Sequence, residues 1–173
     1  MDRLQTKFQN TYRIKSTRLT HYDYSSIGSY FITICTYKRE CCLGEIIESK
    51  LQSNEFTKIC ETCWLQLPNH YDNCELDSFV VMPNHVHFIV RIVETGFKPV
   101  STRYSISEIV RGFKTYTAKK INIIRNKQGI PFWQSRYYDH VIRNEEELYK
   151  VREYICSNPL NWKGDRNNLK NIA

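Results

Sequence analysis

The feature that most constrains the fold of this chain is an apolar run that contains two histidines separated by one residue. The run reads Phe79-Val80-Val81-Met82-Pro83-Asn84-His85-Val86-His87-Phe88-Ile89-Val90. Successive side chains on a β-strand point to opposite faces, so residues two positions apart share a face. His85 and His87 therefore lie on one face of a predicted strand, and the apolar residues between and after them fill the other face.

Two imidazoles on one face of a buried strand need an explanation, because the strand gains nothing from adjacent polar rings. They form a site if both hold a metal ion or a phosphate, since neutral imidazole is a common ligand and a neighbour can fix its second nitrogen. The alternative is a pair of half-exposed histidines on a sheet surface. The motif by itself is too short to decide between these interpretations.

The remaining patterns alternate between those typical of strands and those typical of helices. Strands rich in β-branched and aromatic residues are expected at about 29–37, 75–82, 85–93 and 137–143. One helix is expected at about 54–67, and a second begins at a capping box formed by Ser105 and Glu108. A third is expected at 145–158, between Asn144 and Pro159. The dipeptide Pro83-Asn84 predicts a tight turn or a bulge. The order βαββαβα predicts an α+β fold with helices on one face of a mainly antiparallel sheet.

Length and composition favour one domain over residues 1–173 and a cytoplasmic location. No apolar run approaches the ~20 residues of a membrane span, and the polar, basic residues 1–20 lack the apolar centre of a signal peptide. An odd number of cysteines, seven, favours reduced thiols. Cys60 and Cys63 have metal-like spacing, but no second pair follows, so buried helical thiols are expected rather than a zinc site.

The net charge of +7 is unevenly distributed along the chain. Between Lys98 and Lys127 there are eight basic residues and one acid, Glu108. The helix expected in this segment has an apolar stripe of Ile106, Ile109, Val110, Phe113, Thr117, Ile121 and Ile124, and an opposite side of Arg111, Thr115, Lys119 and Asn122. Such a helix docks on a sheet and presents charge outward. The segment favours a polyanionic partner, most simply nucleic acid, although it is also compatible with a solvated face.

The last expected helix places a tyrosine and an amide one turn apart. Leu148, Val151 and Ile155 form its apolar stripe, and Tyr154 and Asn158 lie together at the edge of that stripe. A tyrosine at such an edge is compatible with two roles, packing at the margin of the core or chemistry.

Four segments, in this order along the chain, carry a stronger signal than any single motif. They are Met82-Pro83-Asn84-His85-Val86-His87, Ser107-Glu108-Ile109-Val110-Arg111-Gly112-Phe113-Lys114, Phe132-Trp133-Gln134-Ser135-Arg136-Tyr137-Tyr138-Asp139-His140-Val141-Ile142-Arg143 and Arg152-Glu153-Tyr154-Ile155-Cys156-Ser157-Asn158-Pro159. Together they resemble the single-tyrosine HUH transposases, and most closely the branch of REP-associated tyrosine transposases. The similarity runs from about Gly28 to Trp162, which is the expected core of the domain.

The resemblance implies a ferredoxin-like antiparallel sheet with the HUH histidines on a central strand and the catalytic tyrosine on a C-terminal helix. It implies metal-dependent cleavage and joining of single-stranded DNA at hairpin-containing sites, with a 5′-phosphotyrosine intermediate, in transposition or in the processing of repetitive palindromic elements. His85 and His87 then correspond to metal ligands, Tyr154 to the nucleophile and Asn158 to a third ligand. Two imidazoles and one amide oxygen leave room for phosphate and water, which suits Mg²⁺ or Mn²⁺ better than zinc.

The expected DNA contacts lie on the basic helix and around the last strand, at Arg111, Lys114, Lys119, Arg136, His140 and Arg143. A non-catalytic module that binds single-stranded or hairpin DNA is the main alternative, because basic and aromatic residues would bind DNA without cleavage. A histidine-triad nucleotide hydrolase is disfavoured, since Ile89 stands where its third histidine is required. Tyr116 and Tyr138 are rival nucleophiles. The resemblance is compatible with a monomer or a homodimer.

Overall fold

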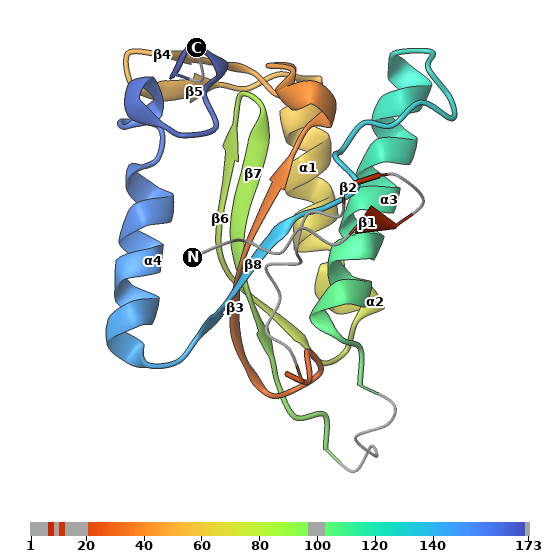
Figure 1. Ribbon diagram of the computed structural model, residues 1–173, viewed down its shortest axis with the longest axis vertical. Coiled ribbons are helices and arrows are strands. Elements are labelled where there is room, and N and C mark those ends of the chain that lie inside the picture. The colour runs from red at the N-terminus through yellow and green to blue at the C-terminus, as the bar shows by residue number, and fades with distance from the viewer. Residues whose placement is uncertain (1–6, 9–10, 13–20, 97–102, 172–173) are drawn as a thin grey trace.

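A four-stranded sheet lies at the centre of the structure, a computed structural model that describes residues 7–8, 11–12, 21–96 and 103–171 (Figure 1). Its strands are β3 (Gly28–Cys35), β6 (Cys74–Met82), β7 (His85–Ile92) and β8 (Tyr138–Ile142). They lie in the order β6-β7-β3-β8, and each neighbouring pair is antiparallel. The helices are α1 (Glu55–Leu65), α2 (Leu67–His70), α3 (Ile106–Ile124) and α4 (Glu145–Ser157). This arrangement confirms the predicted ferredoxin-like α+β fold.

The helices cover both faces of the sheet, so the expectation that they lie on one face was wrong. α1 and α3 pack on one face, where Ile32 and Phe88 belong to the larger core. α4 packs on the opposite face, where its residue Ile155 joins Phe31 and Ile89 in a second, smaller core (Figure 1). Because β3 and β7 carry apolar side chains on both faces, each face needs its own cover.

The turn between β6 and β7 fixes the backbone next to the two histidines. It contains only Pro83 and Asn84, so the tight turn was the correct alternative, and Met82 pairs with His85 across it. The carbonyls of Pro83 and Asn84 accept hydrogen bonds from the backbone amides of Leu43 and Thr36, each at 2.9 Å. His85 is therefore the first residue of β7 and lies at one end of the sheet.

α3 begins as predicted and ends differently. The Ser105 hydroxyl accepts from the backbone amide of Glu108, and the Glu108 carboxylate accepts from the amide of Ser105, which is the expected capping box. In the last turn, Ile124 is exposed, whereas Asn122 is buried and donates its side-chain amide to the carbonyl of Ile130. This hydrogen bond to the following loop, rather than the apolar pattern, decides which side of the last turn faces inward.

The remaining elements are short. Two hairpins are formed by β1 (Lys7–Phe8) with β2 (Thr11–Tyr12) and by β4 (Glu45–Ile47) with β5 (Lys50–Gln52); 3₁₀ helices lie at η1 (Tyr37–Arg39), η3 (Trp162–Gly164) and η4 (Leu169–Asn171). Cys60 and Cys63 are buried free thiols on α1, as predicted. The sequence from Gly96 to Ser105 is typical of a flexible loop, and most of it, residues 97–102, lies outside the described residues. Within the described ranges, no helix combines the length and apolar character that a membrane crossing requires.

A candidate metal site and nucleophile on the α4 face

The two histidines of β7 meet at their Nε2 atoms on the face that α4 covers. Both side chains are fully buried, and the Nε2 atoms of His85 and His87 are 3.0 Å apart. They are brought together by strand geometry, since residues two apart on a strand share a face. Neighbouring strand β3 places Cys35 opposite His85 and Thr33 opposite His87.

Each ring is oriented by a hydrogen bond at its other nitrogen. Nδ1 of His85 is 2.8 Å from the Asn84 side-chain oxygen, and Nδ1 of His87 is 2.8 Å from the Thr33 hydroxyl. The asparagine oxygen can only accept, so Nδ1 of His85 carries the proton and its Nε2 carries a lone pair. With the Thr33 hydroxyl accepting from His87 in the same way, both Nε2 lone pairs face one point, as in metal-binding histidine pairs.

Burial keeps both rings neutral. It lowers the pKa of His85 to about 3, and Arg39 and Arg166 add to the effect. Burial likewise holds the pKa of His87 well below its ordinary value, with smaller contributions from His85 and Arg166. Neutral imidazole is the form that binds a metal, so these rings are prepared for a cation at neutral pH.

Because both rings stay neutral in the folded protein, we expect the metal-free protein to lose stability as the pH falls. Below the ordinary histidine pKa of 6.5 the unfolded chain takes up protons that the folded protein does not. The free energy of unfolding is therefore highest above pH 6.5 and decreases toward pH 4, by up to about 1.4 kcal/mol per pH unit for each ring. Urea unfolding in EDTA at pH 7.5, 6.0 and 5.0 measures this slope. His87→Gln should reduce it, and equal stability at all three values would contradict the prediction.

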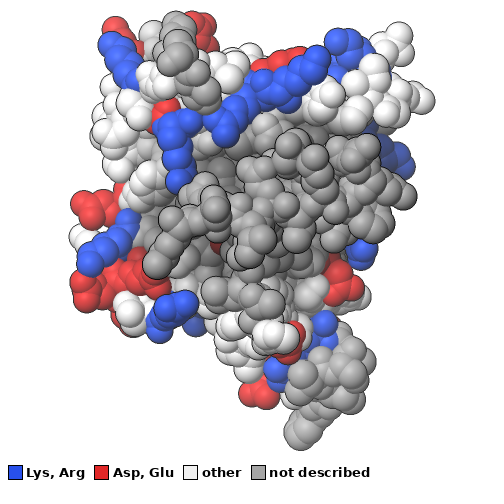
Figure 2. Space-filling model, in the orientation of Figure 1, with Lys and Arg blue, Asp and Glu red and all other residues white. Residues whose placement is uncertain are grey.

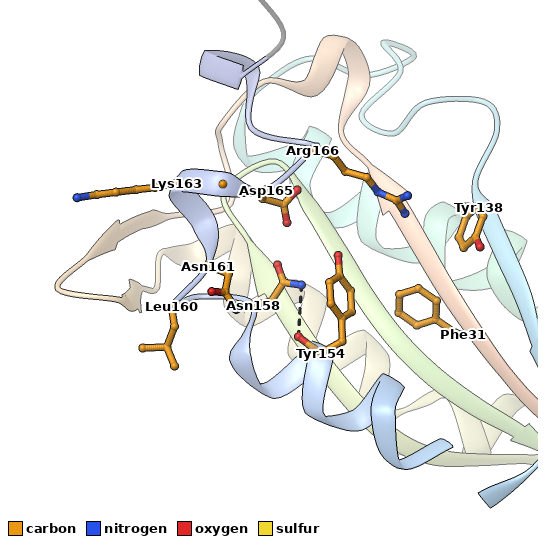
Figure 3. A pocket seen from close by; sticks show the side chains of 10 residues that line it. Phe31, Tyr138, Tyr154, Asn158, Leu160, Asn161, Lys163, Asp165 and Arg166 are labelled. Atoms are coloured by element: carbon orange, nitrogen blue, oxygen red, sulfur yellow. Dashed lines mark hydrogen bonds between the residues drawn. The ribbon is translucent and has the colours of Figure 1, made fainter. Parts of the chain in front are cut away.

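Tyr154 on α4 and Asn158, the residue that caps its C-terminus, lie one turn apart and point into the same region (Figure 3). The Tyr154 hydroxyl is 3.4 Å from Nε2 of His87, and the side chain is 40% exposed toward the cleft. Phe31 holds the tyrosine ring edge to face, with centroids 6.0 Å apart. Asn158 is 2% exposed, and its side-chain oxygen is buried without a hydrogen-bond partner. α4 and its capping residue thus bring a tyrosine hydroxyl and a buried acceptor without a hydrogen-bond partner to the same place.

A carboxylate also belongs to this cluster and was missed by sequence reasoning. Asp165 follows η3, and its Oδ2 lies 3.9 Å from Nε2 of His85. One ligand atom from each of Asp165, His85 and His87 falls within 4.8 Å of the others. The sequence offered no spacing signal, because the aspartate is distant along the chain and lies beyond the expected core.

The site opens into a cleft of about 780 Å³. It is lined by Phe31, Tyr138, Tyr154, Asn158, Leu160, Asn161, Lys163, Gly164, Asp165 and Arg166 (Figure 3). The guanidinium of Arg166 lies over the ring of Tyr138, 5.6 Å from its centroid. Lys and Arg side chains also form a band across the upper part of the face shown in Figure 2. The cleft therefore combines aromatic surfaces with positive charge.

The six expected DNA contacts are placed apart from one another. Arg111 and Lys119 are exposed on α3, across the sheet from the histidines, and Arg136 and Arg143 are exposed on either side of β8. The roles of all six toward DNA stay predictions, and the structure shows what two of the side chains contact within the protein. Lys114 donates to the carbonyls of Gln134 and Ser135 at 2.7 and 2.9 Å, and His140 Nε2 lies 2.7 Å from the Glu147 carboxylate.

Comparison with known proteins matches this chain to a family of transposases. The family model described as transposase IS200 like matches residues 23–158. An uncharacterized protein from Haemophilus influenzae is 37% identical over 169 residues, which cover 88% of this chain and 91% of that protein. A second protein of that organism, whose name assigns it provisionally to the REP-associated tyrosine transposases, is 27% identical over 143 residues, covering 80% of this chain and 73% of its own length.

A solved structure has the same fold. It shows a REP-associated tyrosine transposase bound to a REP hairpin, and it superposes with a TM-score of 0.59 and 19% identity over 86% of this chain and 74% of that one. The residues matched by the family model include both histidines, Tyr154 and Asn158, and end before Asp165. The resemblance predicted from the sequence is confirmed: the chain belongs to the IS200-like transposase family.

Proposed function

We propose that this transposase is a metal-dependent single-stranded DNA endonuclease and strand transferase that forms a 5′-phosphotyrosine intermediate at hairpin-containing sites. The main support is that Tyr154 and Asn158 line one cleft (Figure 3), and that the Tyr154 hydroxyl adjoins the buried pair of His85 and His87 on β7. The tyrosine hydroxyl is 3.4 Å from His87, so the proposed nucleophile and the proposed ligands are direct neighbours.

The side chains present fit a divalent cation. Two Nε2 lone pairs lie 3.0 Å apart, and the buried oxygen of Asn158 has no hydrogen-bond donor. Buried acceptors that face one another are costly when, as here, the donor nearest to Nε2 of His87 is a single hydroxyl at the long distance of 3.4 Å, and a cation removes that cost. His85, His87 and Asn158 would hold Mg²⁺ or Mn²⁺, whose charge offsets the negative charge that builds on the phosphate in the transition state.

Tyr154 is proposed as the nucleophile. Its oxygen attacks the phosphorus of a phosphodiester in line with the 3′-oxygen, forming the tyrosine–phosphate bond as the bond to the 3′-oxygen breaks. The phenol proton passes to water, which reaches the 40% exposed side chain, and the 3′-oxygen leaves as a hydroxyl after taking up a proton. The phosphotyrosine bond retains the energy of the broken linkage, so a 3′-hydroxyl can reverse the attack without ATP.

The DNA is proposed to contact both faces of the sheet, with the single strand on the α4 face and the hairpin reaching the α3 face. The cleft offers Phe31 and Tyr138 for base stacking and Arg166 for a phosphate, which suits the single strand that is cut. The relative bound to a REP hairpin supports a hairpin beside that strand. The exposed basic side chains of α3 lie on the opposite face, so they would contact the phosphates of the hairpin rather than the scissile strand.

Incubation with single-stranded DNA tests the proposal. The DNA is taken from the genomic flanks of the gene and labelled, and the reaction contains Mg²⁺, Mn²⁺ or EDTA. We expect a covalent protein–DNA adduct that survives denaturation in either metal and is absent in EDTA. DNA binding without an adduct in any metal would instead support the non-catalytic binding module.

The basic side of α3 predicts a salt-dependent share of the affinity. Arg111→Gln combined with Lys119→Gln should weaken hairpin binding and lower the log–log salt slope by about one unit per lost phosphate contact. Lys114 is left unchanged because its ammonium holds two backbone carbonyls. Binding titrations with hairpin DNA at about 50 to 200 mM salt, a range over which affinity from phosphate contacts falls steeply, measure the slope. Lys150→Gln, an exposed charge on α4, is the control. An unaltered slope would place the hairpin elsewhere.

A further inference from the structure

The segment after α4 brings a buried carboxylate into the candidate metal site. Oδ2 of Asp165 is 3.9 Å from Nε2 of His85, and the aspartate side chain is 4% exposed. Figure 3 shows this carboxylate on the side of the cleft toward which the amide oxygen of Asn158 and the hydroxyl of Tyr154 point. We propose that Asp165 is a further ligand of the cation, which completes a site of two imidazoles, one amide and one carboxylate. This inference rests on the proposed function.

The position of Asp165 is fixed by the residue that also orients His85. Its Oδ1 accepts from the backbone amide of Asn167 at 2.5 Å. The carbonyl of Asn167 accepts from the side-chain amide of Asn84 at 2.8 Å, in a buried hydrogen bond. The oxygen of that same Asn84 side chain pairs with Nδ1 of His85 at 2.8 Å. One asparagine therefore aligns the first histidine and the segment that carries the aspartate.

Within the described part of the chain, the carboxylate has no cationic ion-pair partner, although Arg39 and Arg166 act on the neighbouring His85 from farther away. Among the residues that the structure describes, no Lys or Arg lies within ion-pair distance of Asp165. Its neighbour in the cluster is the fully buried imidazole of His85. Arg166, the next residue, directs its guanidinium over Tyr138 instead (Figure 3). A buried, unpaired carboxylate is strongly unfavourable, and beside three further acceptors it is explained by a bound cation.

A carboxylate ligand also changes which metal the site prefers. Mg²⁺ and Mn²⁺ favour carboxylate and other oxygen ligands, whereas imidazole nitrogens bind zinc and cobalt well. With Asp165 the site has two oxygen ligands and a negative charge; without it, two imidazoles and a neutral amide remain. The loss of the carboxylate should therefore weaken Mg²⁺ and Mn²⁺ more than Zn²⁺.

Asp165→Asn in the full chain tests the inference by metal binding. Asparagine keeps the oxygen that accepts from Asn167 and removes the charge, so in EDTA the circular dichroism should match the wild type and the unfolding temperature should be equal or higher, because a buried unpaired charge is gone. Calorimetric titration with Mn²⁺ alone should show affinity reduced at least about tenfold, the lower end of the losses seen when supporting groups of metal sites are removed. Titration with Zn²⁺ should show a smaller reduction. Asp23→Asn, which removes an exposed carboxylate outside the cleft, is the control.

The outcomes separate this inference from the proposed function. If His87→Ala abolishes Mn²⁺ binding while Asp165→Asn leaves it unchanged, the inference is wrong and the histidine site stands. If neither variant changes Mn²⁺ binding, the metal site itself is wrong. An Asp165→Asn protein that binds Mn²⁺ normally but fails to cleave DNA also overturns the inference, because the aspartate then acts in another way.

Discussion

Tyr154→Phe is expected to abolish the denaturation-resistant protein–DNA adduct and all strand joining that depends on it. The change removes the oxygen proposed to attack the phosphate and leaves the ring packed against Phe31. The lost contact to His87 is long, at 3.4 Å, so the free energy of unfolding should change by less than about 1 kcal/mol. Metal binding and hairpin binding should also persist. Denaturing gels with labelled single-stranded DNA measure the adduct, and calorimetry and filter binding measure the rest.

Two other tyrosines provide matched controls. Tyr138 lines the same cleft. Tyr116 lies on α3, which covers the other face of the sheet, and its ring stacks on that of His70 with centroids 5.2 Å apart. Tyr138→Phe and Tyr116→Phe should both still form the adduct. Peptide mapping of the wild-type adduct should identify Tyr154. DNA attached to another tyrosine, or an adduct formed by Tyr154→Phe, would overturn the assignment.

His87→Ala and His85→Ala are each expected to reduce cleavage to background. Each substitution removes one of two neutral imidazoles whose Nε2 atoms lie 3.0 Å apart, so a cation at this point would lose a ligand and its charge would no longer offset that of the phosphate. Hairpin affinity measured in EDTA should stay within about twofold of the wild type, because it depends on phosphate contacts elsewhere. Cleavage assays across a Mn²⁺ titration, paired with binding assays, separate the two effects.

The controls address folding and specificity. His70→Ala removes an exposed histidine on α2 and should leave cleavage unchanged. Circular dichroism of both site variants shows whether the loss reflects unfolding, since each replaces a fully buried side chain. Wild-type protein in EDTA should behave as the variants do. Cleavage that continues at the wild-type rate in EDTA would show that the metal assignment is wrong.

Much of the local structure could be predicted because it depends on near neighbours. Alternation around His85 and His87 predicted a strand with both rings on one face, and spacing of one turn placed Tyr154 and Asn158 together on a helix. The capping box at Ser105 and the two-residue turn before His85 are equally local. Apolar periodicity also shows which side chains are buried, but not which face of the sheet a helix covers. That is why all the helices were expected on one face of the sheet.

The partners of individual polar groups could not be predicted. Lys114 and His140 are expected to contact DNA, and that stays a prediction; what the sequence did not indicate is that Lys114 also donates to the carbonyls of Gln134 and Ser135 and that His140 lies beside Glu147. A charged residue on a predicted surface shows only that charge is present. Whether another segment folds back to bind it depends on the path of the whole chain.

By itself the sequence determined the strands, the helices with their caps, the shared face of the two histidines and membership of a transposase family. These follow from residues that are close together along the chain or in recognisable order. Only the tertiary structure decided that α4 crosses the face opposite α3, which brings the Tyr154 hydroxyl within 3.4 Å of His87. It alone carried Asp165 back to His85 through the hydrogen bonds of Asn84. Such contacts join distant segments, and their geometry is set by sheet pairing and side-chain packing rather than by spacing in the sequence.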